Sequence, residues 1–256
     1  MRRIPLVAVD DAARVRLAGS FDSAAELYDR VRPRFAEAAL DWVIPDGARR
    51  VLDLGAGRGK LTVSLVERGL DVVAVDPSPN MLDRLRANLP GVDSRLGRAE
   101  DTGLLDASVD AVVVGSAFHW FARPAADAEI ARVLKPGGSA GLLWNRRDPF
   151  SSTVHAFDAA QAHANEPFPQ EGADVTLDPV LFGPTEHRDF PHAQRVTPDQ
   201  FVDLVASRSY VIEMAESERS RLLDRVREFV RTAPELAGRE DFDLPYLTLA
   251  RRALRR

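Results

Sequence analysis

A chain of 256 residues that is 45% hydrophobic and 29% charged is long enough to bury a substantial core, as one α/β domain with a cap or as two small domains. Its net charge of −5 gives no electrostatic support for a nucleic-acid partner, and the absence of cysteine excludes disulfides, thiolate catalysis and cysteine-ligated metals. No stretch has the length and hydropathy of a signal peptide or a membrane span, so we expect a cytoplasmic protein without a membrane partner.

Residues 1–46 are expected to begin as an arm and to continue as helix. Apolar side chains recur at helical spacing between positions 27 and 42, and Pro33 interrupts this pattern. We therefore expect two helices or one kinked helix, ending near the Pro-Asp-Gly sequence at 45–47.

Three glycines at alternate positions follow the first predicted strand, at 51–54. After Gly55, Gly57 and Gly59, a helical pattern runs from Leu61 to Arg68. This order places backbone N–H groups and a helix N-terminus against a polar ligand. A dinucleotide fingerprint would need its third glycine at position 60, and a phosphate-binding Walker loop would need Ser or Thr after the lysine. Neither spacing is present.

The second predicted strand, at 70–76, is a run of β-branched residues that ends in Asp76. A carboxylate about twenty residues beyond such a turn can accept hydrogen bonds from both hydroxyls of a ribose. Asp76 could instead cap the helix that Pro77-Ser78-Pro79 opens, and the two roles are compatible.

Two further strands are predicted at 92–96 and 110–115. The first leads into the acidic loop 97–101, and the second into Ser116 and the aromatic turn 117–121. The carboxyl ends of parallel strands meet at one edge of a sheet, so we expect the aromatic turn to face the same crevice as the glycine turn. We favour a site role over a structural role for His119 in this turn.

A helix ending near Leu134 is expected to stop at Lys135-Pro136-Gly137-Gly138, before a strand at 140–145. Five strands that alternate with helices predict a parallel, doubly wound α/β sheet, with a core over residues 47–145.

Residues 146–256 differ in composition from the preceding part of the chain, with five prolines between 146 and 190. We expect a sixth strand at 189–196, a helix capped by Thr197, an amphipathic helix at 217–230 and a last strand at 244–250. Four of the five histidines lie in this part without metal-site spacing, so no metal is expected.

Several of these segments resemble one family. The pattern acidic-x-Gly-x-Gly-x-Gly from Asp53 to Gly59, the pentad Ala-Phe-His-Trp-Phe at 117–121 and Arg-Val-Leu-Lys-Pro-Gly-Gly at 132–138 are similar to class I S-adenosylmethionine-dependent methyltransferases. The pentad and the segment 21–33 resemble the small-molecule type related to trans-aconitate methyltransferase (methyltransferase type 11-like). This resemblance implies a Rossmann-like, seven-stranded, mostly parallel sheet with an antiparallel C-terminal strand. It also implies that residues 1–46 lie over the cofactor and that residues 146–256 add a helical cap.

The resemblance also assigns roles to individual residues. Asp53 would orient the glycine turn, Asp76 would bind the ribose, and Ala99 with Asp101 would bind the adenine. The implied cofactor-binding set is Asp53, Gly55, Ala56, Gly57, Gly59, Asp76, Pro77, Met81, Ala99, Glu100, Asp101, Ser116 and Phe118. The implied acceptor-binding set is Tyr28, Arg32, Trp120, Trp144 and Arg146. Arg58 stands where relatives often carry a small hydroxyl residue.

The expected reaction is transfer of the methyl group of S-adenosyl-L-methionine to a small molecule, preferably to a carboxylate or hydroxyl oxygen, with release of S-adenosyl-L-homocysteine. A hydroxyl acceptor would need a base, for which His119 is the candidate, whereas Arg146 or Arg147 could hold a carboxylate acceptor. One alternative is a non-catalytic relative that binds the cofactor as a partner or regulatory module. A nicotinamide-dependent oxidoreductase is a less favoured alternative, because the glycine spacing opposes it. Monomer and homodimer both remain open.

Overall fold

The computed structural model describes residues 32–148, 151, 175–207, 209–212 and 214–256. The chain divides into two compact units. The larger unit consists of residues 33–195 and 243–256, and the smaller unit consists of residues 1–32 and 196–242. Among the described residues, no helix combines the length and apolar character needed to cross a membrane.

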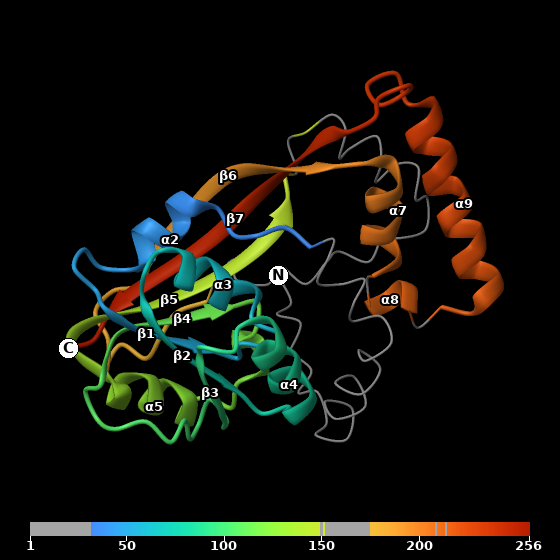
Figure 1. Ribbon diagram of the computed structural model, residues 1–256. Helices are drawn as coiled ribbons and strands as arrows, with labels where there is room; N and C mark the ends of the chain where they lie inside the picture. The colour runs from blue at the N-terminus through green and yellow to red at the C-terminus, as the bar shows by residue number, and fades with distance from the viewer. Residues whose placement is uncertain (1–31, 149–150, 152–174, 208, 213) are drawn as a thin grey trace, which may run out of the picture. The chain divides into compact units, whose positions relative to one another are not determined.

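The described part of the chain contains one seven-stranded sheet with the order β3-β2-β1-β4-β5-β7-β6 (Figure 1). Neighbouring strands from β3 to β5 are parallel, and β7 is antiparallel to β5. This confirms the predicted doubly wound sheet with its antiparallel C-terminal strand. The strands are β1 Arg50–Leu54, β2 Asp71–Asp76, β3 Asp93–Leu96, β4 Val109–Gly115, β5 Leu134–Arg147, β6 Glu186–Val196 and β7 Phe242–Leu254.

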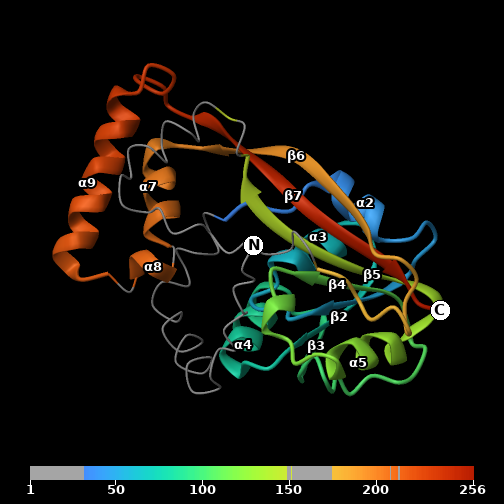
Figure 2. The same ribbon diagram turned by 180° about the vertical axis from the view of Figure 1, so that it is seen from behind.

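Helices of the larger unit cover both faces of the sheet (Figures 1 and 2). On one face lie α2 (Glu37–Val43), α3 (Lys60–Glu67) and α4 (Pro79–Asn88), and on the other face lies α5 (Ala125–Val133). Alternate residues of each strand therefore enter different core clusters, as the period of two in a β-strand requires. On β5, for example, Leu142 packs in the cluster with α5, and Leu143 packs in the cluster with α2.

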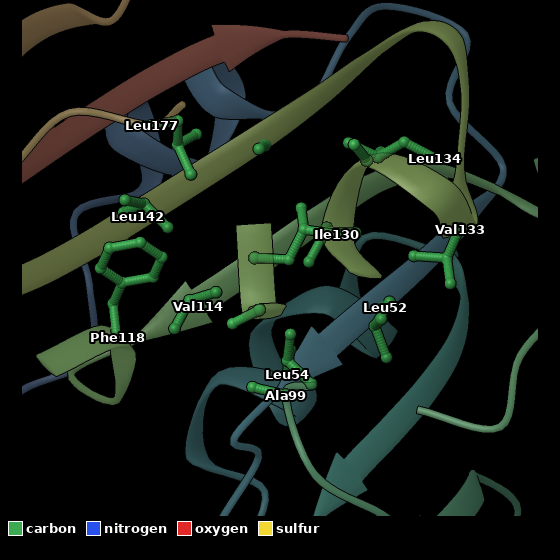
Figure 3. Packing of buried hydrophobic residues seen from close by; sticks show 14 of the residues in the cluster. Leu52, Leu54, Ala99, Val114, Phe118, Ile130, Val133, Leu134, Leu142 and Leu177 are labelled. Carbon is green, nitrogen blue, oxygen red and sulfur yellow. The ribbon is translucent and has the colours of Figure 1, made fainter. Parts of the chain in front are cut away.

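The core cluster on the α5 side is shown in Figure 3. Side chains from β1, β4, β5 and α5 meet there, together with Phe118 from a short 3-10 helix and Leu177 from a loop. On the opposite face, α2 approaches the sheet closely at Gly141, where a Cβ atom would lie 2.6 Å from the Cβ of Val43. Glycine at this strand position therefore sets how near the helix can pack.

The junction between α5 and β5 differs from the prediction. The helix ends at Val133, before the Pro-Gly-Gly sequence, and β5 begins at Leu134 and extends to Arg147. The strand is longer than the expected 140–145 because Leu134 pairs with Val109 of β4 and because β7 pairs with β5 from Ser139 to Arg147. Non-local pairing of this kind leaves little signal in the local sequence.

The smaller unit is helical where it is described. Its helices are α7 (Pro198–Ala206), α8 (Ser209–Ile212) and α9 (Glu216–Thr232). Thr197 and Gln200 form a reciprocal capping box at the start of α7, as its sequence indicated. The apolar stripe of α9, including Leu222 and Val226, is buried.

Candidate functional site

The glycine turn lies at the carboxyl end of β1, and glycine is suited to each of its three positions for a different physical reason. Gly55 has φ +75°, and a Cβ there would lie 2.6 Å from the Cβ of Ala117, so the turn packs directly on the segment after β4. Gly59 is the left-handed N-cap of α3 and packs against Leu85. Gly57, with φ +55°, has no atom within 4 Å of where its Cβ would be. Open space at a glycine in a left-handed conformation leaves the backbone accessible to a ligand.

Asp76 holds the glycine turn against the end of β2. Its Oδ2 accepts a hydrogen bond from the Gly57 N–H at 2.8 Å, and its Oδ1 accepts one from the Ser78 N–H at 2.9 Å. Ser78, rather than Asp76, is the N-cap of α4, because its hydroxyl accepts from the Met81 N–H. Burial raises the pKa of Asp76, and the two backbone hydrogen bonds oppose this shift. The side chain is therefore placed beside Gly57, at the edge where the ribose of a nucleoside was expected.

Asp53 lies beneath the turn and is buried. Its Oδ2 accepts a hydrogen bond of 2.6 Å from the Thr62 hydroxyl on α3, and its Oδ1 has no partner among the described residues. Burial raises the pKa of Asp53 to about 7, with Asp76 adding to the rise and Thr62 opposing it. The sequence analysis did not single out Thr62, whose only signal was a hydroxyl in the first turn of the helix that follows the glycines. Arg58, also in this turn, is only 8% exposed, so it does not extend into solvent.

The acidic loop forms a tight turn in which Arg98 and Asp101 exchange backbone hydrogen bonds. Ala99 is buried, Asp101 is exposed, and Glu100 is half-buried. Oε1 of Glu100 accepts a hydrogen bond of 2.7 Å from the Ala122 N–H, which ties this loop to the segment after β4. An adenine-binding role for Asp101 or Glu100 stays a prediction, and the structure adds a tertiary role for Glu100.

The segment after β4 begins with a strained residue. Ser116 is exposed and has φ +53°. This left-handed conformation is uncommon for a residue other than glycine, and the residues that adopt it tend to cluster at functional sites. Phe118 is buried on the short 3-10 helix Phe118–Trp120 and packs edge-on against Phe121, with ring centroids 5.5 Å apart. His119 and Trp120 are exposed neighbours, with ring centroids 4.8 Å apart. A reacting role for His119 stays a prediction.

Trp144 and Arg146 lie near the carboxyl end of β5, where β4 has already ended. Gly115, the last residue of β4, pairs with Leu143, so Trp144 is one residue beyond this pair. Trp144 is 3% exposed and belongs to the core cluster that contains Phe118, and its Nε1 has no hydrogen-bond partner among the described residues. Arg146 is exposed and, two positions on, has its side chain on the same face of the strand.

The remaining predicted site residues are characterised mainly by their burial. Pro77 is exposed, Met81 is half-buried near the start of α4, and Ala56 is buried in the cluster with Leu85. Arg32 is half-buried and is grouped with the smaller unit, and Tyr28 lies outside the described residues.

Known proteins with similar sequences are methyltransferases. Residues 52–142 match the methyltransferase domain family. An uncharacterized methyltransferase of Mycobacterium tuberculosis is 48% identical over 234 residues, which cover 91% of this chain and 95% of that protein. The malonyl-[acyl-carrier protein] O-methyltransferase of Serratia marcescens is 36% identical over 124 residues, which cover 48% of this chain and 47% of that protein.

A solved methyltransferase structure also resembles this chain in its fold. The structure of a candidate type II methyltransferase from Anaeromyxobacter dehalogenans has a TM-score of 0.64 and 26% identity, and the match covers 88% of this chain and 97% of that chain. These matches leave the nicotinamide-dependent oxidoreductase alternative without support. With a glycine turn, Asp53 and Asp76 at the carboxyl edge of the sheet, the chain belongs to the class I S-adenosylmethionine-dependent methyltransferase family.

Proposed function

We propose that the protein transfers the methyl group of S-adenosyl-L-methionine to an oxygen of a small molecule by direct displacement. The acceptor oxygen would attack the sulfonium methyl carbon in line, the methyl–sulfur bond would break, and S-adenosyl-L-homocysteine would leave with the electron pair. A hydroxyl acceptor would pass its proton to His119, whereas a carboxylate acceptor has no proton to lose. The observation that carries the proposal is the open space at Gly57, whose backbone N–H donates to Asp76. The protein's main contribution would be positioning, which can supply roughly 7–11 kcal/mol of the barrier.

The side chains at the site match the chemical groups of the cofactor. The ammonium group of the amino acid part and the sulfonium carry positive charge, and Oδ1 of Asp53 is a buried acceptor without a hydrogen-bond partner among the described residues. The ribose offers two hydroxyl donors, and the Asp76 carboxylate offers acceptor lone pairs beyond the two that the backbone N–H groups use. Ser116 and Phe118 would border the sulfonium, and Ala99 would border the adenine.

The side chains at the carboxyl end of β5 favour an oxygen as the atom that accepts the methyl group. An indole N–H buried without a partner costs about 1–3 kcal/mol, and a bound carboxylate or hydroxyl oxygen would satisfy the Nε1 of Trp144. Arg146, on the same face, would pair with a carboxylate. O-methylation in the S. marcescens relative is consistent with this choice, although that relative matches about half of the chain.

A glycine-to-alanine pair tests cofactor binding. Gly57 and Gly47 both have positive φ and open space around the missing Cβ, so alanine at either position should cost about 1 kcal/mol of stability through backbone strain. Calorimetric titration with S-adenosylmethionine should show at least about tenfold weaker binding for Gly57→Ala and unchanged binding for Gly47→Ala. Equal binding by both variants would contradict the proposed site.

A panel of small carboxylic acids and phenols with radiolabelled cofactor tests the acceptor class. With a carboxylate acceptor, Arg146→Gln should raise the KM for the acid and His119→Ala should leave neutral-pH turnover unchanged. With a phenol, His119→Ala should lower kcat by about 10²–10⁴-fold. Cofactor binding without transfer to any member of the panel would instead favour the non-catalytic alternative.

A further inference from the structure

A buried carboxylate on α5 joins two segments that are distant in the sequence. Asp127 has no exposed surface. Its Oδ1 accepts a hydrogen bond of 2.9 Å from Arg123 Nε, and its Oδ2 accepts hydrogen bonds from Arg123 Nη2 and, at 3.0 Å, from the Asp178 N–H. The fork of the guanidinium is thus held in one orientation by two parallel hydrogen bonds.

The guanidinium that Asp127 holds lies on Phe118. The Cζ atom of Arg123 is 5.2 Å from the centroid of the Phe118 ring, within the range of a cation–π contact. Phe118 packs edge-on against Phe121, whose ring lies 3.6 Å from where a Cβ at Gly55 would be. A continuous series of contacts therefore runs from Asp127 to the glycine turn.

The second segment, 177–182, is anchored to the same core. Leu177 and Phe182 are buried in the cluster that contains Phe118, and Asp178 forms a turn through a 2.8 Å hydrogen bond from the Val180 N–H to its Oδ1. Figure 3 shows Leu177, Leu142 and Phe118 within this cluster. The Asp178 backbone N–H points to the Asp127 carboxylate that orients Arg123.

We propose that Arg123 and Asp127 are positioning residues for the cofactor site. Asp127 fixes Arg123, Arg123 fixes the ring of Phe118, and Phe118 with Phe121 sets the segment after β4 against the glycine turn. Because Asp127 also holds the Asp178 backbone, one carboxylate positions both the cofactor-side segment and segment 177–182. The inference rests on the proposed function in that the glycine turn is taken as the cofactor site.

A second carboxylate provides a matched control. Asp110, at the start of β4, accepts a 2.7 Å hydrogen bond from Lys135 Nζ and 2.9 Å bonds from the backbone N–H groups of Arg49 and Arg50. It therefore also combines one cation with backbone donors. It lies at the amino-terminal edge of the sheet, opposite the glycine turn.

The test compares S-adenosylhomocysteine binding in four full-length variants by calorimetry, well below each melting temperature. Asp127→Asn and Arg123→Gln should raise the Kd about tenfold or more, whereas Asp110→Asn and Lys135→Gln should change it by less than about twofold. Arg123→Lys, which keeps the charge but not the fork, should fall between wild type and Arg123→Gln. If Asp127→Asn does not fold, the half-exposed Arg123 still provides the measurement.

A double-mutant cycle separates positioning from general destabilisation. If Arg123 acts through Phe118, then the effects of Arg123→Gln and Phe118→Leu on the Kd should be clearly less than multiplicative in the double variant. Kd values within twofold of wild type for Arg123→Gln and Asp127→Asn, or fully multiplicative effects, would overturn the inference. Failure of the wild-type protein to bind S-adenosylhomocysteine would contradict the proposed function itself, which is a different outcome.

Discussion

Asp53 is a buried carboxylate with an oxygen unpaired within the described part of the chain, an arrangement that costs free energy in a folded protein unless a ligand pairs with that oxygen. A carboxylate without solvent exposure has one oxygen paired with Thr62 and the other without a partner among the described residues, and its pKa is raised to about 7. The ionised form is disfavoured because burial removes its hydration. A cationic ligand above the turn would favour ionisation and recover this free energy. Groups of this kind are frequent in binding and active sites.

The pKa of Asp53 predicts a pH dependence of stability. A raised pKa in the folded state means that stability decreases as pH rises from the ordinary value of 3.8 through about 7. Between pH 5 and pH 8 the wild-type protein should lose roughly 2–3 kcal/mol from this group, a loss that Asp53→Asn should not show. Urea unfolding at both pH values measures the difference. A constant difference between wild type and variant would show that Asp53 does not titrate in this range.

At the scale of elements, polar side chains connect the end of β5 to the segment before α2. Asn145 Nδ2 donates to the carbonyl oxygen of Arg34, and its Oδ1 accepts hydrogen bonds from Thr248 on β7 and from a ring nitrogen of His192 on β6. The Thr248 hydroxyl in turn accepts the Ala36 N–H at 2.9 Å. Three strands and the approach to α2 thus share one network of polar groups, most of them partly buried, next to Trp144.

Removing the central hydroxyl should therefore destabilise the larger unit. Thr248→Val leaves the Ala36 N–H without an acceptor and removes a donor to Asn145, so the free energy of unfolding should fall by about 1–3 kcal/mol. Thr232→Val is the control, because that hydroxyl donates to the Glu228 carbonyl oxygen on the exposed side of α9, and its loss should cost less than about 0.5 kcal/mol. Chemical denaturation measures both. Similar losses for the two variants would show that the network adds nothing beyond a single surface hydrogen bond.

At the scale of the whole molecule, carboxylates that are partly or fully buried act on stability in opposite directions. For Asp110, burial raises the pKa, but hydrogen bonds from Arg50, Lys135 and Arg49 outweigh burial and bring the pKa to about 2. The same balance lowers the pKa of Glu129, which Arg132 and Thr102 hydrogen-bond. These two groups stabilise the fold above the ordinary carboxyl pKa, and this contribution disappears as pH falls towards 2.

The stability of the protein should consequently pass through a maximum on the acidic side of neutrality. Protonation of Asp110 and Glu129 lowers stability at low pH, and ionisation of Asp53 lowers it towards pH 8. Asp110→Asn should flatten the acid limb and leave the alkaline limb unchanged. Melting temperatures from pH 3 to pH 8 test this profile. Stability that rises steadily to pH 8 would contradict the assigned direction for Asp53.

The sequence by itself determined the class of fold, the succession of strands and helices along the chain up to β5 and the position of the glycine turn. Apolar runs and their periods record which backbone segments are buried, and parallel strands bring their carboxyl ends to one edge. These signals are local, so they survive without knowledge of partners.

Only the tertiary structure decided which polar groups meet. The Asp76 bond to Gly57, the Glu100 bond to Ala122 and the Asp127 bond to Asp178 join residues 19 to 51 positions apart through strand register and loop packing. The sequence did not predict the role of Asp127. Its role depends on burial and on the direction of a backbone N–H from a distant segment, and neither is encoded in the residues that surround it.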